Sequence, residues 1–182
     1  KKYETPENIG IKWQLDVKYI PKQCYVDDKP DKFYQYTVID EASRERFIYP
    51  YREQSSYSNI DFIKRAIIFF EYKPETIQTD NGLEFTYTMN TDKIHPFDVF
   101  CNSLNINHKL IKPRTPRHNG KVERSHKIDG ERFYKFLSFF SYDDLIYQMK
   151  NYLKRSNNIP MQTLDWLTPI EMRKKIKTTF NN

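Results

Sequence analysis

The chain has 182 residues, and its 30 Lys and Arg against 24 Asp and Glu give a formal net charge of +6. Its hydrophobic content of 38% and aromatic content of 16% support one domain with a real core and argue against disorder. The basic residues are concentrated in one segment. Residues 109–135 hold nine cations and three anions, so their net charge of +6 equals the formal net charge of the whole chain. Such a patch favours a nucleic acid partner over a merely solvated basic surface.

The two cysteines, Cys24 and Cys101, are far apart and make neither a disulfide framework nor a Cys-x-x-Cys pair, which fits a reducing cytosol. No apolar run reaches transmembrane length and no signal peptide opens the sequence, so we expect no membrane association. Because the first residue is Lys, we expect a fragment of a longer protein. The histidines and cysteines show no zinc-finger spacing.

Residues 1–10 are polar and form a lead-in. Residues 11–19 then alternate strictly, which predicts a strand with Trp13 and Leu15 on its apolar face and Asp16 on its polar face. An acid in mid-strand is disfavoured by propensity and is a weak sign of function, although an exposed strand acid is the simpler interpretation of this segment alone. Two further strands, residues 33–39 and 46–51, complete an antiparallel meander, and Asp40 follows the second strand.

The rest of the chain alternates helices and strands. We expect a helix capped by Asn59 or Asp61 and ended by Pro74, then a strand over residues 75–79 that delivers Asp80 to an Asn81-Gly82 turn with positive φ. A loop over 84–93, a helix from Pro96 to Leu104 and a strand over 106–110 are predicted next. A long helix from Pro116 or Asn119 to Leu137 and a helix over 142–155 follow. The last predicted element is a short helix from the capping box Thr168-Pro169-Ile170-Glu171 to about Ile176. This order predicts an α/β fold with a mixed five-stranded sheet flanked by helices.

Four segments now resemble a known family. They are Trp13-Gln14-Leu15-Asp16, Val38-Ile39-Asp40 with Ser43-Arg44, Gln78-Thr79-Asp80-Asn81-Gly82-Leu83-Glu84-Phe85, and Asn119-Gly120-Lys121-Val122-Glu123-Arg124-Ser125-His126-Lys127. Together they look like the catalytic core of DDE transposases and retroviral-type integrases, most closely the bacterial insertion-sequence transposases. The resemblance covers roughly residues 9–176 and implies a ribonuclease-H-like fold, in agreement with the predicted element order.

The resemblance implies a catalytic triad of Asp16, Asp80 and Glu123. Asp16 would bridge two Mg²⁺ (or Mn²⁺) ions, and Asp80 and Glu123 would each complete one site for in-line displacement at phosphorus. The supporting residues Asn81 and Gly82 would shape the Asp80 loop. The DNA-binding residues would be Asn119 and Lys127, with the neighbouring cations Arg114, Arg117, Lys121 and Arg124.

Two features depart from the family pattern. The 43 positions from Asp80 to Glu123 exceed the usual interval, and we place the excess in a surface loop over residues 86–95. Many members carry Lys or Arg seven positions after the glutamate, where this chain has Gly130. That role passes to Lys127, Arg124 or Arg132, or is lost.

Simpler roles compete for several of these residues. Glu123 alone could pair with Arg124 or Lys127 on a solvated helix, but the ordered set of acids favours catalysis. We expect a structural role for Asp40, with Arg44 or Arg46, and a loop or supporting role for Glu84. His118 and His126 are expected to contact DNA or to pack rather than to bind metal.

The sequence therefore predicts a DNA transposase or integrase core, with residues 11–140 as the ribonuclease-H-like part, 141–182 as C-terminal helices, and a DNA-binding domain upstream of the fragment. Such an enzyme would cut element-end DNA and join the 3′-hydroxyl to target DNA as a homodimer or higher oligomer. The implied location is cytoplasmic, associated with a bacterial nucleoid. The alternatives are a metal-dependent nuclease of the same fold without strand transfer, and a DNA-binding module whose catalysis has lapsed.

Overall fold

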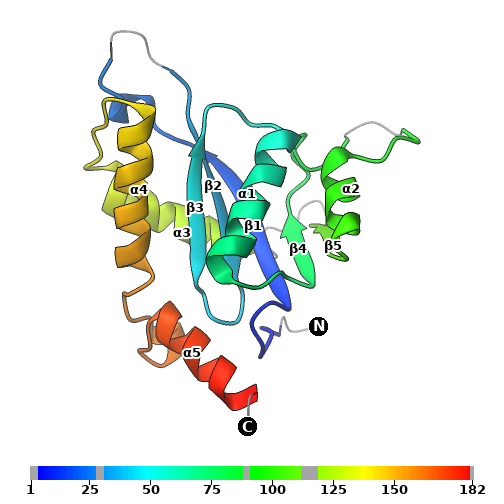
Figure 1. Ribbon diagram of the computed structural model, residues 1–182. Helices are drawn as coiled ribbons and strands as arrows, with labels where there is room; N and C mark the ends of the chain where they lie inside the picture. The colour runs from blue at the N-terminus through cyan, green and yellow to red at the C-terminus, as the bar shows by residue number, and fades with distance from the viewer. Residues whose placement is uncertain (1–3, 28–30, 88–90, 112–118, 181–182) are drawn as a thin grey trace.

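A five-stranded mixed sheet forms the centre of the protein, as seen in a computed structural model that describes residues 4–27, 31–87, 91–111 and 119–180 (Figure 1). The strands are β1 (Lys12–Tyr19), β2 (Tyr34–Asp40), β3 (Arg46–Tyr51), β4 (Thr76–Thr79) and β5 (Asn107–Leu110), in the order β3-β2-β1-β4-β5. β1, β2 and β3 pair antiparallel, whereas β4 is parallel to both β1 and β5. The predicted mixed five-stranded sheet is therefore confirmed, and β1 lies at its centre.

Helices cover both faces of this sheet (Figure 1). α1 (Ser56–Phe70) lies across one face and contacts α2 (Pro96–Ser103), while α3 (Gly120–Asp129) packs on β1 and β2 from the other face. α4 (Tyr142–Ser156) runs beside β3, and α5 (Pro169–Phe180) follows it. Among the described residues, none of these helices combines the length and the apolar character needed to cross a membrane.

The apolar residues form two clusters. The first contains Trp13, Leu15 and Ile77 of the sheet with Phe62 of α1 and Phe97 of α2, all fully buried. The second contains Ile20 and Phe33 with Leu145 and Met149 of α4. The alternation of β1 is thus confirmed for Trp13 and Leu15, but part of its polar face is covered, because Gln14 is only 1% exposed beneath α3.

Two predicted helix boundaries are wrong. α1 begins at Ser56 and is capped by Ser55, whose hydroxyl accepts the Ser58 N–H at 3.1 Å, rather than by Asn59 or Asp61. α5 continues to Phe180, beyond Ile176. Its predicted capping box is confirmed, since the Thr168 N–H donates to the Glu171 carboxylate and the Glu171 N–H donates to the Thr168 hydroxyl.

Asp40 has the predicted structural role, but not through Arg46. It is fully buried and accepts hydrogen bonds from the Gly10 N–H at 2.8 Å, the Trp13 indole at 3.2 Å and the Ser43 N–H at 2.9 Å. Asp40 therefore ties the lead-in segment to the turn after β2.

Arg46 instead pairs with Asp129, at the end of α3. Two hydrogen bonds of 2.9 and 2.6 Å join the guanidinium to the carboxylate, which also accepts from Gln35 at 2.8 Å and Tyr152 at 2.7 Å. Burial alone would raise the pKa of Asp129, but Arg46 and these hydrogen bonds lower it below its usual value. At this point the predicted long helix changes to a π-helical turn, Gly130–Tyr134.

Breaking the buried pair should be costly. Asp129→Asn leaves Arg46 charged and without its carboxylate, so we expect a loss of about 3–5 kcal/mol in the free energy of unfolding, measured by urea denaturation. The matched control is Asp31→Asn, because Asp31 pairs with Arg52 at the surface and both side chains are more than half exposed. It should cost at most about 1 kcal/mol, and an equal loss in both variants would contradict the assignment.

A second buried acid makes stability depend on pH. Glu45 is 2% exposed, and its carboxylate lies 3.1 Å from the Arg173 guanidinium of α5. Burial raises the pKa of Glu45 to about 7, although Arg173 opposes the shift. Because the folded state then holds a proton that the unfolded chain releases at lower pH, the contribution of Glu45 to stability is fully present below the pKa of the unfolded chain and is lost as the pH rises to about 7.

Glu45→Gln should remove this dependence. Between pH 5 and 8 the wild type should lose on the order of 2–3 kcal/mol more than the variant in denaturant unfolding. Parallel stability profiles for the two proteins would show that Glu45 does not titrate in this range.

Candidate active site

Asp16 and Asp80 are brought together by strand register. β1 and β4 are parallel, and Gln14 lies opposite Gln78. Asp16 and Asp80 each follow two residues later, so the register brings both to the same end of two adjacent strands, with Asp80 just past the last residue of β4. Asp80 is the first residue after β4, where the chain leaves the sheet.

Glu123 comes to this face on the first turn of α3, where it is exposed. The helix begins without a side-chain cap from Asn119. The cap is supplied by Gln14, whose side-chain oxygen accepts the N–H groups of Lys121 and Val122, both at 3.1 Å. The strand that carries Asp16 therefore also fixes the start of the helix that carries Glu123.

His126, one turn after Glu123, joins α3 to the same strand. Its Nδ1 lies 3.3 Å from Asp16 Oδ2, and its Nε2 lies 2.9 Å from the hydroxyl of Thr37, the residue opposite Asp16 in β2. The Asp16 carboxylate also accepts the Val17 N–H at 2.9 Å. His126 is 8% exposed, so the structure favours packing over the predicted alternative of a DNA contact.

The negative charge of Asp16 contributes to the pKa values of the other two acids. Burial, then the charge of Asp16, raises the pKa of Glu123, and Asp80 adds to the shift although His126 opposes it. Burial also raises the pKa of Asp80, against the Gly82 N–H hydrogen bond, with further contributions from Asp16 and Glu84. The pairing of Glu123 with Arg124 or Lys127 is not observed, since no ion pair joins it to either residue.

The chemistry of this donor set fits a divalent cation. Carboxylate oxygens are the ligands that Mg²⁺ prefers, and a cation would relieve the repulsion that raises these pKa values. In the described part of the chain, no three His, Cys, Asp or Glu side chains are already close enough to enclose a metal ion. The acidic side chains would therefore have to move to enclose a metal ion. Glu123 can do so because it is exposed and makes no ion pair with the neighbouring cations of α3.

The loop after Asp80 differs from the predicted turn. Neither Asn81 nor Gly82 has positive φ, so that prediction is wrong. The reason for glycine at position 82 is instead the nearby Glu84 side chain, because a Cβ at this position would lie 2.6 Å from the Glu84 carboxylate. The Gly82 N–H donates to Asp80 Oδ1 at 3.0 Å, and the Asn81 amide donates to the Ile111 carbonyl at 3.2 Å. Both residues thus shape the loop.

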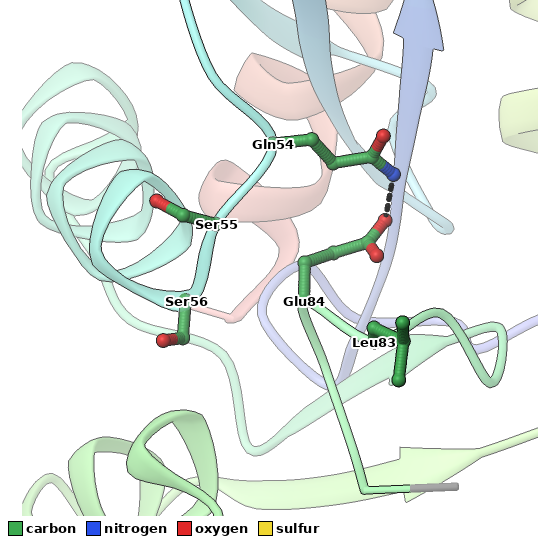
Figure 2. Close-up of a pocket in the computed structure, with 5 residues that line it drawn as sticks. All are labelled: Gln54, Ser55, Ser56, Leu83 and Glu84. Carbon is green, nitrogen blue, oxygen red and sulfur yellow. Dashed lines mark hydrogen bonds between the residues drawn. The ribbon is translucent and has the colours of Figure 1, made fainter.

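A pocket of about 330 Å³ lies beside this loop, between its Leu83 and Glu84 and the start of α1. Figure 2 shows the Gln54 amide pointing at the Glu84 carboxylate across the pocket, with a hydrogen bond between them. Glu84 is 8% exposed and raises the pKa of Asp80. Glu84 therefore contributes to the electrostatic environment of Asp80 from within the loop, where a loop or supporting role was predicted.

The predicted DNA-binding residues fall into three groups. Arg124 and Lys127 are exposed on the same side of α3 as Glu123. Lys121 donates to Glu41 at 2.9 Å, and Asn119 is buried with its amide 3.5 Å from the Leu15 carbonyl. Arg114 and Arg117 lie outside the described residues, as do His118 and the predicted helix start at Pro116.

The space next to Gly130 is occupied by a cation from β1. The Lys18 ammonium lies 3.7 Å from the position that a Cβ at Gly130 would take, and it donates to the His126 carbonyl at 3.0 Å. Burial lowers the pKa of Lys18, with opposing contributions from Asp129 and Cys24. The sequence prediction named Lys127, Arg124 and Arg132 as replacements for a cation at Gly130, or its loss, and did not consider Lys18, which lies beside Gly130 and donates to a main-chain carbonyl.

The fold and the arrangement of acids define the class of protein. Residues 7–116 match the family model described as Integrase core domain, which is more than half of the chain, and the chain belongs to that family. The matched range contains Asp16 and Asp80, whereas Glu123 lies beyond it.

Curated relatives agree with this membership. A putative integrase of Spiroplasma virus SpV1-C74 is 38% identical over 136 residues, which cover 69% of this chain and 36% of the relative. A retrovirus-related Pol polyprotein from a transposon of Nicotiana tabacum is 30% identical over 101 residues, 54% of this chain and 7% of the relative. The chain thus spans about a third, or less, of the length of these relatives.

Solved structures share the fold. The HTLV-2 integrase catalytic core domain, solved in complex with magnesium, has a TM-score of 0.68 at 22% identity, covering 91% of this chain and 97% of that one. A simian T-cell lymphotropic virus intasome has a TM-score of 0.70 at 20% identity, covering 93% of this chain and 56% of that one. The predicted ribonuclease-H-like fold is therefore confirmed.

The mutual influence of the acids can be measured without metal. Asp16→Asn should lower the pKa of Glu123, because it removes a neighbouring negative charge, as followed by NMR titration of the carboxyl carbons. Glu84→Gln is the control, since the charge of Glu84 contributes to the pKa shift of Asp80 but not to that of Glu123. A Glu123 titration unchanged by Asp16→Asn would mean that the two groups are far apart.

Proposed function

We propose that this chain is the catalytic core of a DNA transposase or integrase, which cuts element-end DNA and joins the 3′-hydroxyl to target DNA. The observation that supports the proposal is that Asp16, Asp80 and Glu123 lie near one another, since burial and then the charge of Asp16 contribute to the raised pKa values of Asp80 and Glu123. Membership of the integrase core domain family supports the same reaction class.

In this proposal, Asp16, Asp80 and Glu123 would together hold two Mg²⁺ or Mn²⁺ ions. The bound ions supply activation of the attacking hydroxyl and stabilisation of the leaving oxygen at phosphorus. His126 and Thr37 hold the Asp16 carboxylate in place. Gly82 and Glu84 orient Asp80 from the loop side.

DNA is the proposed partner. Arg124 and Lys127 are exposed beside Glu123, so they can meet backbone phosphates without blocking the acids. Lys121 and Asn119 remain proposed contacts that would have to leave their present partners. Assembly as a homodimer or higher oligomer on paired DNA ends is also proposed, since the HTLV-2 core is described in dimeric and trimeric forms.

A nuclease of the same fold is the second candidate, because the acids alone can support hydrolysis. The two candidates differ in product: a nuclease yields cut DNA, whereas a transposase also yields joined DNA. A lapsed DNA-binding module is less well supported, since all three acids are present and the charge of Asp16 contributes to the raised pKa values of both Asp80 and Glu123.

The test is incubation of the protein with Mg²⁺ and labelled candidate element ends, with cleavage and joining resolved on denaturing gels. Glu123→Gln should reduce both products by at least about 10³-fold, because it removes a proposed metal ligand. The matched control is Glu131→Gln, an exposed acid eight residues further along the chain, which should keep full activity. Full cleavage by the Glu123→Gln protein would contradict the assignment.

A further inference from the structure

A second histidine belongs to a chain of polar side chains that the proposed function does not use. His108 of β5 has Nδ1 2.5 Å from Asp98 Oδ1 of α2, and Nε2 2.9 Å from the hydroxyl of Thr79 in β4. The Thr79 hydroxyl in turn donates to the Asp80 carbonyl at 2.9 Å. The chain of contacts therefore ends on the main chain of a proposed metal ligand.

The fold explains how these residues meet. β4 and β5 are parallel with Ile77 opposite His108, so His108 and Thr79 project from the same face of the sheet, opposite to Gln78. α2 packs against β5 and brings Asp98 to the imidazole. Phe97 holds the ring edge-on, with ring centroids 4.9 Å apart. The chain thus reaches Asp80 from the side of the sheet that faces away from α3.

The hydrogen atoms can be assigned. Burial lowers the pKa of His108, although Asp98 opposes the shift, so the ring is neutral near pH 7. With Nδ1–H directed at the Asp98 carboxylate, Nε2 is an acceptor. The single hydrogen of the Thr79 hydroxyl then faces two acceptors, Nε2 and the Asp80 carbonyl, both at 2.9 Å, and is shared between them in a three-centre hydrogen bond. This arrangement fixes the rotamer of Thr79.

The order Asp, His and Thr resembles the catalytic triad of a hydrolase, but the burial of these residues excludes a role for Thr79 as a nucleophile. Thr79 is 0% exposed, so no substrate can reach its hydroxyl. The His108 side chain is 4% exposed, and only Asp98, at 36%, reaches solvent. The groups can act on Asp80 only through its backbone.

Asp80 needs such support because it lies where the sheet ends. The Ile111 N–H donates to the Thr79 carbonyl, which ties the end of β4 to the segment after β5, and Asp80 is the next residue along the chain. We propose that Asp98, His108 and Thr79 form a positioning chain that fixes the main chain at Asp80 and so orients its carboxylate for metal binding. The inference rests on the proposed function, and the three residues are positioning residues rather than catalytic ones.

The test compares four variants of the protein. Thr79→Val keeps the shape but removes the hydroxyl, whereas Thr79→Ser keeps the hydroxyl. Thr76→Val is the matched control at the other end of β4, and Asp98→Asn alters the exposed end of the chain. Calorimetry gives the Mn²⁺ dissociation constant, and steady-state cleavage in Mg²⁺ gives kcat and KM for DNA.

Thr79→Val should weaken Mn²⁺ binding about 10-fold, at the low end of the effect of residues that orient metal ligands, and should lower kcat while leaving KM for DNA within about twofold. Thr79→Ser and Thr76→Val should behave as wild type. Asp98→Asn should shift Mn²⁺ binding in the same direction, and combining it with Thr79→Val should add little, because both act through one chain. Wild-type Mn²⁺ binding by Thr79→Val, or binding by Thr79→Ser as weak as by Thr79→Val, would overturn the inference.

Metal-free NMR separates this inference from the proposed function. The amide signals of Asp80 and Asn81 should move in Thr79→Val and stay in Thr76→Val, and unmoved signals in both would overturn the positioning chain. If the wild type neither binds Mn²⁺ nor cuts DNA, the proposed function fails even when those amide signals move.

Discussion

The polar side of β1 holds α3 on the sheet, and the relative position of the three acids depends on this contact. Gln14 caps the first turn of the helix, Asp16 contacts His126, and Lys18 donates to the His126 carbonyl. These three residues alternate along one strand, so a single rigid element makes all three contacts. An amphipathic helix would be held by its apolar side, but α3 is largely polar and is held by hydrogen bonds instead.

This polar contact continues into the interior. The hydroxyl of Thr37 contacts His126 and accepts from Gln35, which donates to Asp129, the partner of Arg46. A proposed metal ligand is thus connected, contact by contact, to the buried ion pair where α3 becomes π-helical. Because every group in such a network needs its partner, the network favours one placement of α3 over others.

The sequence predicted what depends on local pattern. Alternation located β1 and its apolar face, whereas the grouping of Asp16 with Asp80 came from the family resemblance and not from the predicted topology. The cap of α1 was misplaced because Ser55, Asn59 and Asp61 can all cap, and the choice between them depends on where the helix packs. Gly82 was misjudged because its requirement comes from the Glu84 carboxylate and not from its own φ.

Contacts between distant segments could not be predicted in the same way. The cap on α3 comes from Gln14, more than 100 residues earlier, and the cation beside Gly130 comes from Lys18. Each follows from the packing of α3 on β1, which no local pattern encodes. The same holds for the Asp98, His108 and Thr79 contacts, which join α2, β5 and β4.

The central claim is that Asp16, Asp80 and Glu123 together bind divalent metal. The most direct measurement is anomalous diffraction from crystals of the protein grown with Mn²⁺. The account predicts an anomalous peak bounded by the Asp16 and Asp80 carboxylates, with Glu123 turned towards the metal. An ordered site without an anomalous peak, or Mn²⁺ bound only elsewhere, would contradict it.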